Sequence, residues 1–321
     1  VTDAENARRT IAEFGGRQTR SGDYRSVFPG VHLKYRFTPN LIARAGYTEN
    51  IGRPGIGQLI PRTTVNYDNQ TVSTSNPSLL PQWAKNFDVT GELYFEPAGM
   101  FTFGVFEKQI RKFIYTSGGA TIPTGTDNGF NGEYAGYSLT TQYNGGFARV
   151  RGLELGYNQQ FTFLPGALKG PSASFNYTWI NQHGVGSAAT PGGTPILGRE
   201  PTATTPAVYF SRRDIANFIP AAANASLSWR YQKFNTSLLY NFTGENPTSI
   251  SILTPALNQY RYSMKTLNVS AGYQYRPNVG FSLNASNILN EPQRWYVGYK
   301  DRMRRTTINF VTITAGVNGR F

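Results

Sequence analysis

The residue types that most often perform acid–base, nucleophilic or metal chemistry are few in this chain and widely separated. The two histidines, His32 and His183, lie far apart in the sequence, so no local metal site can be built from them. Asp127 and Glu133 share one polar stretch and could form a glycosidase-like pair, but solvated loop acids explain them better. There is no Gly-x-Ser-x-Gly elbow, no phosphate-binding loop and no cysteine. The sequence therefore predicts a protein that is not an enzyme and that needs no metal or cofactor.

Side chains that could hold a ligand are concentrated in long polar stretches between apolar segments. Aromatic rings offer flat faces to sugars or chelates, and arginine can hold a carboxylate or phosphate through two hydrogen bonds. Loops held by a rigid scaffold often carry such contacts. The predicted substrate-binding residues are Arg62, Asn66, Tyr67, Asn69, Tyr134, Tyr137, Arg212, Arg213, Trp295 and Tyr296.

The composition limits the classes of protein to which the chain can belong. It has 321 residues, with 20 Tyr, 21 Phe and 34 Gly, and a formal net charge of +13. The basic residues are scattered and no nucleic-acid fold signature is present, so nucleic acid is not the predicted partner. The mean hydropathy of −0.40 would suggest a soluble protein. That reading fails for membrane β-barrels, because polar residues facing the lumen cancel apolar residues facing lipid.

Apolar and polar residues alternate in short segments from residue 30 onward. From Val31 to Phe37 the odd-numbered residues are apolar, and a similar alternation runs from Val311 to Phe321. A period of two predicts strands with one apolar and one polar face. We count about eleven strands of roughly ten residues, which suffices to cross a bilayer at a tilt. The last strand is predicted to begin near Arg305.

The connections between these strands alternate between short and long. Short turns fall near residues 38, 97, 166, 232 and 277, and long polar loops span 49–85, 116–147, 183–218, 244–263 and 288–304. Short turns on one side and long loops on the other are typical of outer-membrane barrels, whereas a soluble sandwich mixes loop lengths at its two ends. The sequence therefore predicts an all-β, transmembrane, antiparallel up-and-down β-barrel. A secreted β-rich binding module is the less favoured alternative.

An odd number of strands cannot be the whole barrel. Single-chain bacterial barrels have an even strand number, and an open arc would leave two unpaired edges in lipid. We therefore interpret residues 30–321 as the second half of a barrel of about 22 strands, a size whose lumen is plugged. Residues 1–29 show no clear strand and are interpreted as the tail of an extracellular loop.

Several charged residues fall on the predicted polar face of the strands. They could contact a plug in the lumen or be solvated, and Glu154 could instead pair with an arginine of a neighbouring strand or contact substrate. The predicted lumen- or plug-facing residues are Lys34, Arg36, Arg44, Glu154, Arg230 and Arg276, with Arg320 on the same face.

Six segments in order resemble the TonB-dependent outer-membrane transporters. They are a Gly-Arg-Pro box at 52–54, an Asn-Pro-x-Leu-x-Pro segment at 76–81, the strand at 101–115, an Arg-Gly-Leu-Glu strand at 151–154, the Asn-rich segment 283–290 and the terminal Phe321. Nothing in the chain resembles the plug domain or the TonB-binding box.

This resemblance implies energy-coupled nutrient import across the outer membrane of a Gram-negative bacterium. It implies coupling to TonB–ExbB–ExbD through a plug domain that this chain does not contain, so a missing amino-terminal half or a second chain must supply it. It also implies recognition of Phe321 by the barrel-assembly machinery. Alternatives remain open: a structural or interaction barrel completed by another chain without transport, and lipopolysaccharide contact as the role of Arg212, Arg213, Arg302, Arg304 and Arg305.

Deletion of Phe321 tests the predicted insertion signal. If the assembly machinery recognises this terminal aromatic residue, the truncated protein should be synthesised at the normal rate but accumulate less in the outer membrane. Folded protein in the outer-membrane fraction, compared with total protein, measures this. Unaltered insertion of the truncated chain would remove Phe321 from that role.

Overall fold

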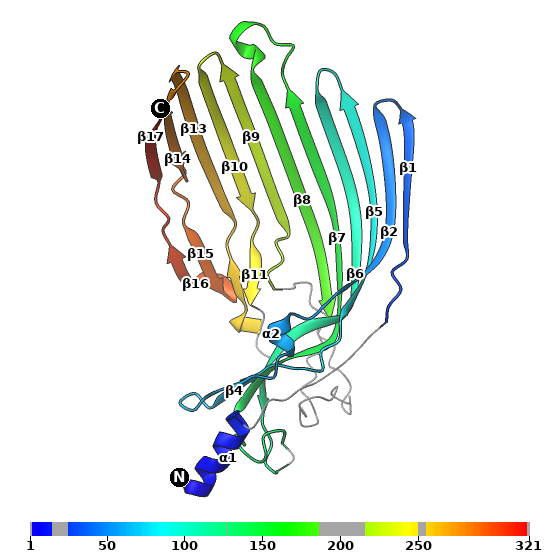
Figure 1. The fold of residues 1–321 in the computed structure, drawn as a ribbon, viewed down its shortest axis with the longest axis vertical. Coiled ribbons are helices and arrows are strands. Elements are labelled where there is room, and N and C mark those ends of the chain that lie inside the picture. Colours follow the sequence, from blue (N-terminus) through cyan, green and yellow to red (C-terminus); the bar gives the residue numbers. More distant parts are fainter. Residues whose placement is uncertain (1, 15–24, 127, 186–215, 250–254, 320–321) are drawn as a thin grey trace.

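The protein is described here from a computed structural model, which describes residues 2–14, 25–126, 128–185, 216–249 and 255–319. Eleven strands lie side by side in one curved antiparallel sheet (Figure 1). In spatial order they are β1 (Gly30–Thr38), β2 (Leu41–Gly52), β5 (Gln82–Phe95), β6 (Gly99–Thr121), β7 (Ser138–Gln160), β8 (Pro171–Val185), β9 (Ala221–Tyr231), β10 (Phe234–Thr243), β13 (Met264–Arg276), β14 (Val279–Ser286) and β17 (Thr312–Gly319). The predicted fold class and strand number are confirmed: the sheet is half of a barrel and does not close.

Smaller elements lie in the long connections. The hairpin of β3 (Thr63–Asn66) and β4 (Thr71–Thr74) joins the large sheet because β4 pairs in parallel with β7. A separate four-stranded sheet contains β11 (Asn246–Ser249), β12 (Gln259–Arg261), β15 (Gln293–Val297) and β16 (Tyr299–Thr307). The helices are α1 (Asp3–Phe14), α2 (Ile56–Leu59), η1 (Gly166–Lys169) and η2 (Pro255–Leu257). Among the described residues, no helix has the length and apolar character needed to cross a membrane.

All five predicted short turns lie at the same end of the sheet, at the top of Figure 1, and the long connections lie at the bottom. Helix α1 lies at the long-connection end and occupies residues interpreted from sequence as loop only. The assignment of residues 1–29 to an extracellular loop stays a prediction.

The connection between β6 and β7 contains more strand than the sequence predicts. Half of the predicted loop 116–147 is strand, because β6 continues to Thr121 and β7 begins at Ser138. Three register shifts interrupt the pairing of β6 with β7, and glycines near these shifts weaken the alternation of apolar and polar residues. The alternation therefore does not reveal the outer ends of these two strands. The last strand was also misplaced: Arg305 belongs to β16 in the smaller sheet, and β17 begins at Thr312.

The register gives the large sheet two chemically different faces. Directly paired residues of an antiparallel sheet lie on the same face. One row across five strands is apolar: Leu227, Leu238, Val269, Ala285 and Ile313. The adjacent row is polar: Ser228, Ser237, Ser270, Asn284 and Thr314. Leu239 breaks the pattern, since it lies on the polar face between Ser226 and Asn268.

The apolar face is uncovered, whereas the polar face has hydrogen bonds of its own. Leu283 is 50% exposed and Val317 is 68% exposed. On the other face, the hydroxyls of Ser174 and Ser226 lie 2.6 Å apart, and Asn224 donates to Asn176 at 2.8 Å. Apolar side chains on an exposed sheet face would be an aggregation hazard in water, but they suit contact with lipid.

A compact buried cluster lies at the long-connection end of the large sheet. Val72, Ile122, Phe130, Tyr134 and Leu139 form a buried cluster that we call the loop core. The β3–β4 hairpin reaches it through the pairing of Val72 with Leu139. Asn128 supports the chain between β6 and β7: it accepts from the amides of Phe130 and Gly132 and donates to the carbonyls of Pro123 and Glu133. This connection is therefore a preformed surface.

Substitution of Leu283 by arginine tests the assignment of the faces. Leu283 lies on the apolar face between Ala271 and Ala315. In the full-length protein folded into lipid, Leu283→Arg should lower the free energy of unfolding by about 2–4 kcal/mol if the residue lies near the midplane. Denaturant titration in lipid vesicles measures this. Asn284→Arg, on the polar face of the same strand, is the matched control and should cost clearly less; equal costs would contradict the two-faced assignment.

Candidate functional site

Predicted substrate-binding residues of the first two long connections meet at the loop core. The rings of Tyr67 and Tyr134 lie 6.4 Å apart, and those of Tyr134 and Tyr137 lie 5.7 Å apart. Tyr134 is buried, whereas Tyr67 is 44% exposed. Asn66 accepts from the amide of Asn69 at 2.9 Å and so shapes the turn of the hairpin. Of this group, the exposed Tyr67 is best placed to meet a ligand.

Arg62 precedes this hairpin, and its side chain is exposed. Its main-chain amide donates to the hydroxyl of Ser75 at 2.8 Å, which holds the two ends of the hairpin together. Arg212 and Arg213 lie outside the described residues, as do Arg320 and Phe321.

Trp295 and Tyr296 occupy β15 in the smaller sheet, on opposite faces because they are adjacent. Tyr296 is buried, packs between the rings of Tyr260 and Tyr262, and donates to Glu245 at 2.7 Å. Burial, and then the bond to the Glu245 carboxylate, raise the pKa of Tyr296 well above its usual range. Lys300 completes this group with an ion pair to Glu245 at 2.9 Å, and that pairing raises the pKa of Lys300. Tyr296 therefore stabilises the smaller sheet through its buried ring and its hydrogen bond to Glu245.

Trp295 lies in register between two arginines that have no carboxylate partner in the described part of the chain. Arg261 and Arg305 flank it in register, and the guanidinium carbon of Arg305 lies 3.9 Å from the indole centroid. Within the described ranges, neither arginine has a carboxylate at salt-bridge distance, and the buried Arg261 Nε has no hydrogen-bond partner. We call Arg261, Trp295 and Arg305 the Trp295 row. It combines a flat ring with two cations, an arrangement suited to an anionic ligand.

Sequence reasoning did not identify Arg261. The residue stands in a three-residue strand, and only the pairing of β12 with β15 brings it beside Trp295. The sequence offers Arg305 only as one of several basic residues that could contact lipopolysaccharide; its stacking on Trp295 depends on the pairing of β15 with β16.

Five of the predicted lumen-facing charges, Lys34, Arg36, Arg44, Glu154 and Arg230, share the polar face of the sheet. Arg44 donates to Glu92 at 2.7 Å, and Lys34 stands directly opposite Arg44. Glu154 is paired in register with Gly104 and Thr178, and no arginine in the described part of the chain forms a salt bridge with it. A neighbouring-strand arginine therefore does not explain Glu154 among these residues. Whether this face contacts a plug stays a prediction.

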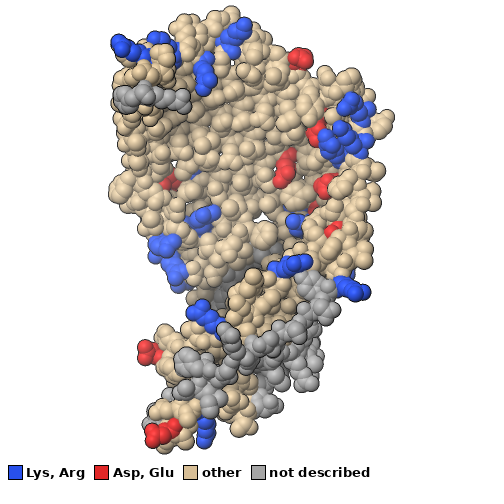
Figure 2. Space-filling model, in the orientation of Figure 1, with Lys and Arg blue, Asp and Glu red and all other residues tan. Residues whose placement is uncertain are grey.

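Arg36 and Arg230 extend this set along the polar face, whereas a register shift between Gln274 and Arg276 pairs Arg276 with Val279 on the apolar face. Arg36 pairs in register with Ile42, and Arg230 pairs with Asn235. The guanidinium carbon of Arg276 lies 5.4 Å from the centroid of the Tyr275 ring, at the short-turn end of β13. Figure 2 shows that much of the visible strand region carries no charge and that Lys and Arg gather toward its edges.

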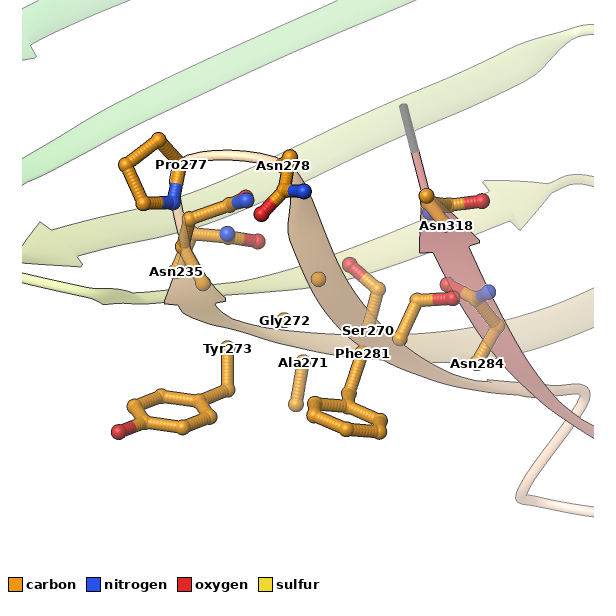
Figure 3. A pocket seen from close by; sticks show the side chains of 14 residues that line it. Asn235, Ser270, Ala271, Gly272, Tyr273, Pro277, Asn278, Phe281, Asn284 and Asn318 are labelled. Carbon is orange, nitrogen blue, oxygen red and sulfur yellow. The ribbon is translucent and has the colours of Figure 1, made fainter. Parts of the chain in front are cut away.

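A trough of about 580 Å³ opens on the polar face of β10, β13, β14 and β17. In Figure 3, Asn235, Asn278 and Asn318 lie on the trough side, whereas Tyr273 and Phe281 point to the opposite face. Its lining contains no charged residue. Within the described residues, the side-chain amides of Asn235, Asn284 and Asn318 form no hydrogen bond, so they are available to a partner.

Glycines keep the floor of this trough open. A Cβ atom at Gly272 would lie 2.6 Å from Oδ1 of Asn235, and one at Gly280 would lie 3.1 Å from Oε1 of Gln274. A side chain at either position would displace these groups and fill the space. The trough therefore offers neutral donors and acceptors above a bare backbone, which suits a neutral polar partner better than an ion.

The two histidines lie on different faces as well as on distant strands. His32 pairs with Gly46 on the polar face, and His183 pairs with Arg149 on the other face. Among the described residues, no cluster of three His, Cys, Asp or Glu could hold a metal ion.

Solved structures share this fold. One is a mutant ferric enterobactin receptor from Pseudomonas aeruginosa in complex with enterobactin: identity is 12%, the TM-score is 0.58, and the match covers 91% of this chain and 40% of that one. Another is the FrpB iron transporter from Neisseria meningitidis, with 13% identity, a TM-score of 0.54, and coverage of 92% and 39%.

The siderophore receptor PiuA from Acinetobacter baumannii is also similar, with 13% identity, a TM-score of 0.55, and coverage of 90% and 35%. The chain thus spans well under half the length of each of these three structures. No curated protein matches the sequence. The profile of the family described as TonB dependent receptor-like, beta-barrel, matches residues 4–290. This match covers most of the chain, which therefore belongs to the TonB-dependent receptor β-barrel family.

Proposed function

We propose that the chain is the carboxy-terminal barrel half of an energy-coupled nutrient importer in the outer membrane of a Gram-negative bacterium. The observation that carries this proposal is the eleven-stranded half-barrel itself, with an apolar face on one side and a polar face on the other. Family membership supports it. The remaining strands come from another part of the protein or from a second chain, because free strand edges are not tolerated in lipid.

Import requires a lumen that is closed at rest and opened by energy. We assign closure to a plug domain outside this chain and opening to TonB–ExbB–ExbD acting on that plug. The neutral trough supports a polypeptide partner on the inner wall, because unpaired asparagine amides can bond both the N–H and the C=O groups of a peptide. The barrel-assembly machinery is the proposed partner for insertion.

The Trp295 row is the best-supported substrate contact, with Tyr67 as a second element. Arg261 and Arg305 lack carboxylate partners within the described residues, and Trp295 offers a flat face beside them. These groups favour a substrate with carboxylate, phosphate or similar anionic groups, such as an anionic metal chelate, over a neutral sugar. Tyr296 then has a supporting role, because it holds β15 in place through Glu245.

Uptake by cells tests both the transport function and the Trp295 row. Radiolabelled ferric chelates, cobalamin and oligosaccharides should be offered separately to cells with the receptor, without it, and without TonB. The proposal expects one class to enter only when receptor and TonB are both present. The double change Arg261→Ala with Arg305→Ala should then reduce uptake of an anionic substrate by about tenfold or more.

The matched control for that variant is Arg302→Ala in the same strand as Arg305. It should leave uptake near the wild-type level, and all variants should show unchanged thermal stability of the barrel. Failure of every substrate class to depend on the receptor would favour a structural barrel without transport. Receptor-dependent uptake that the double variant does not alter would remove the Trp295 row from the site.

If the plug contacts the trough, a side chain that fills the trough should weaken the contact between plug and barrel. Gly272→Leu places side-chain atoms where Asn235 now lies, so the plug should fit less well and the barrel should leak bulky hydrophilic compounds. Cell sensitivity to an antibiotic too large for ordinary porins measures the leak. Gly91→Leu is the control, since open space surrounds Gly91. Equal sensitivity in the two variants would argue against plug contact at this place.

A further inference from the structure

The apolar face of the sheet ends at a definite row of residues. Along β5, the residues on this face are Phe95, Leu93, Gly91, Val89 and Phe87, followed by Lys85. Eight residue steps at about 3.3 Å each, tilted by about 40°, give a band of roughly 20 Å. This approaches the height of about 25 Å typical of the apolar belt of such barrels. Lys85 therefore marks the edge of the belt nearest the long connections.

The last two rows at this edge are charged on β6 and β7 and still face outward. Glu107 and Arg151 are paired in register, in the same row as Phe87. Lys85, Gln109 and Arg149 form the next row with Glu49. Because side chains alternate between faces without a register shift over this part of β5, β6 and β7, these groups lie on the lipid side and not in the lumen.

Contacts within these rows leave an excess of positive charge. Glu107 accepts from Arg149 at 2.7 Å and from Arg151 at 3.1 Å, so one carboxylate serves two guanidinium groups. Lys85 pairs with Glu49 at 3.3 Å, and the indole of Trp83 also donates to Glu49 at 2.8 Å. We call Glu49, Lys85, Glu107, Arg149 and Arg151 the boundary cluster. Three cations share two carboxylates there, and the side chain of Arg151 is 54% exposed.

We propose that the boundary cluster binds the phosphate groups of lipopolysaccharide in the outer leaflet. The inference rests on the proposed place of the chain in the outer membrane. At headgroup depth, an outward-facing guanidinium meets lipid headgroups, and its planar N–H groups match a phosphate through two bonds. The shared Glu107 orients both arginines but neutralises only one. Loop arginines such as Arg302 lie beyond the belt, in the smaller sheet, and are less suited to this contact.

The proposal is tested by lipid binding to the purified full-length receptor in neutral detergent. Three probes are compared: lipopolysaccharide, the same lipid after enzymatic removal of its phosphates, and phosphatidylglycerol. The wild-type protein should bind phosphorylated lipopolysaccharide about tenfold more tightly than the dephosphorylated form. Arg149→Gln with Arg151→Gln should abolish this preference. A preference that survives in the double variant would overturn the proposal.

Two further variants separate lipid binding from a purely structural ion pair. Glu107→Gln frees both arginines, so it should strengthen binding of phosphorylated lipopolysaccharide; if the cluster only stabilises the strands, it should lower barrel stability without stronger binding, which would contradict the proposal. Lys108→Gln changes the neighbouring residue on the opposite face and should leave lipid binding unchanged. Equal binding of phosphatidylglycerol and lipopolysaccharide would overturn the assignment to the glycolipid.

Outer-membrane fractionation of the same variants distinguishes failure of the lipid-binding proposal from failure of the proposed function. A receptor that is found in the outer membrane and imports substrate, yet shows no phosphate preference, would contradict only the boundary cluster. A receptor absent from the outer membrane would contradict the proposed function itself.

Discussion

The constraint on which the rest of this structure depends is the pairing of main-chain hydrogen-bonding groups within a bilayer. A strand surrounded by lipid finds no water for its N–H and C=O groups, so each must bond to a neighbouring strand. The described sheet satisfies this for its nine inner strands, but β1 and β17 each pair on one side only. The half-barrel is therefore stable in a membrane only when further strands cover both edges. This is the physical reason for assigning the chain to a larger barrel.

The two faces of the sheet differ in the groups that they present. The outward face carries Leu227, Leu238 and their row neighbours, whose exposure would be unfavourable in water. The inward face carries serine and asparagine pairs, the Arg44–Glu92 pair and the neutral trough. In the described parts of the long connections, the loop core and the smaller sheet hold Tyr67 and Trp295 in place. The sheet forms a wall along the strands, and Tyr67 and Trp295 lie at its long-connection end. This arrangement suits the proposed import, in which a substrate is first recognised and then passes along the wall.

The sequence predicted the parts of the structure that follow from period-two alternation. Strands such as β9, β10 and β13 alternate because one side meets lipid, and the five short turns follow from their position between such segments. Where neither side of a strand meets lipid, the alternation of apolar and polar residues weakens. The sequence therefore predicts a loop at the outer ends of β6 and β7, and it predicts the wrong start for the last strand, near Arg305. The candidate site was harder to predict. The sequence does not show that Tyr296 is buried, because its hydrogen-bond partner Glu245 is distant in the sequence. It also does not single out Arg261, because only the pairing of β12 with β15 brings that residue beside Trp295.

Amide hydrogen exchange of the two edge strands, measured on the natural protein in its membrane, tests the central claim most directly. If further strands complete the barrel, the amides of β1 and β17 should exchange as slowly as those of β9, which is paired on both sides. If the sheet is open, every second amide of β1 and β17 should point to an unpaired edge and exchange quickly. Slow exchange at both edges is the result that the account predicts, and fast exchange at alternate positions would contradict it.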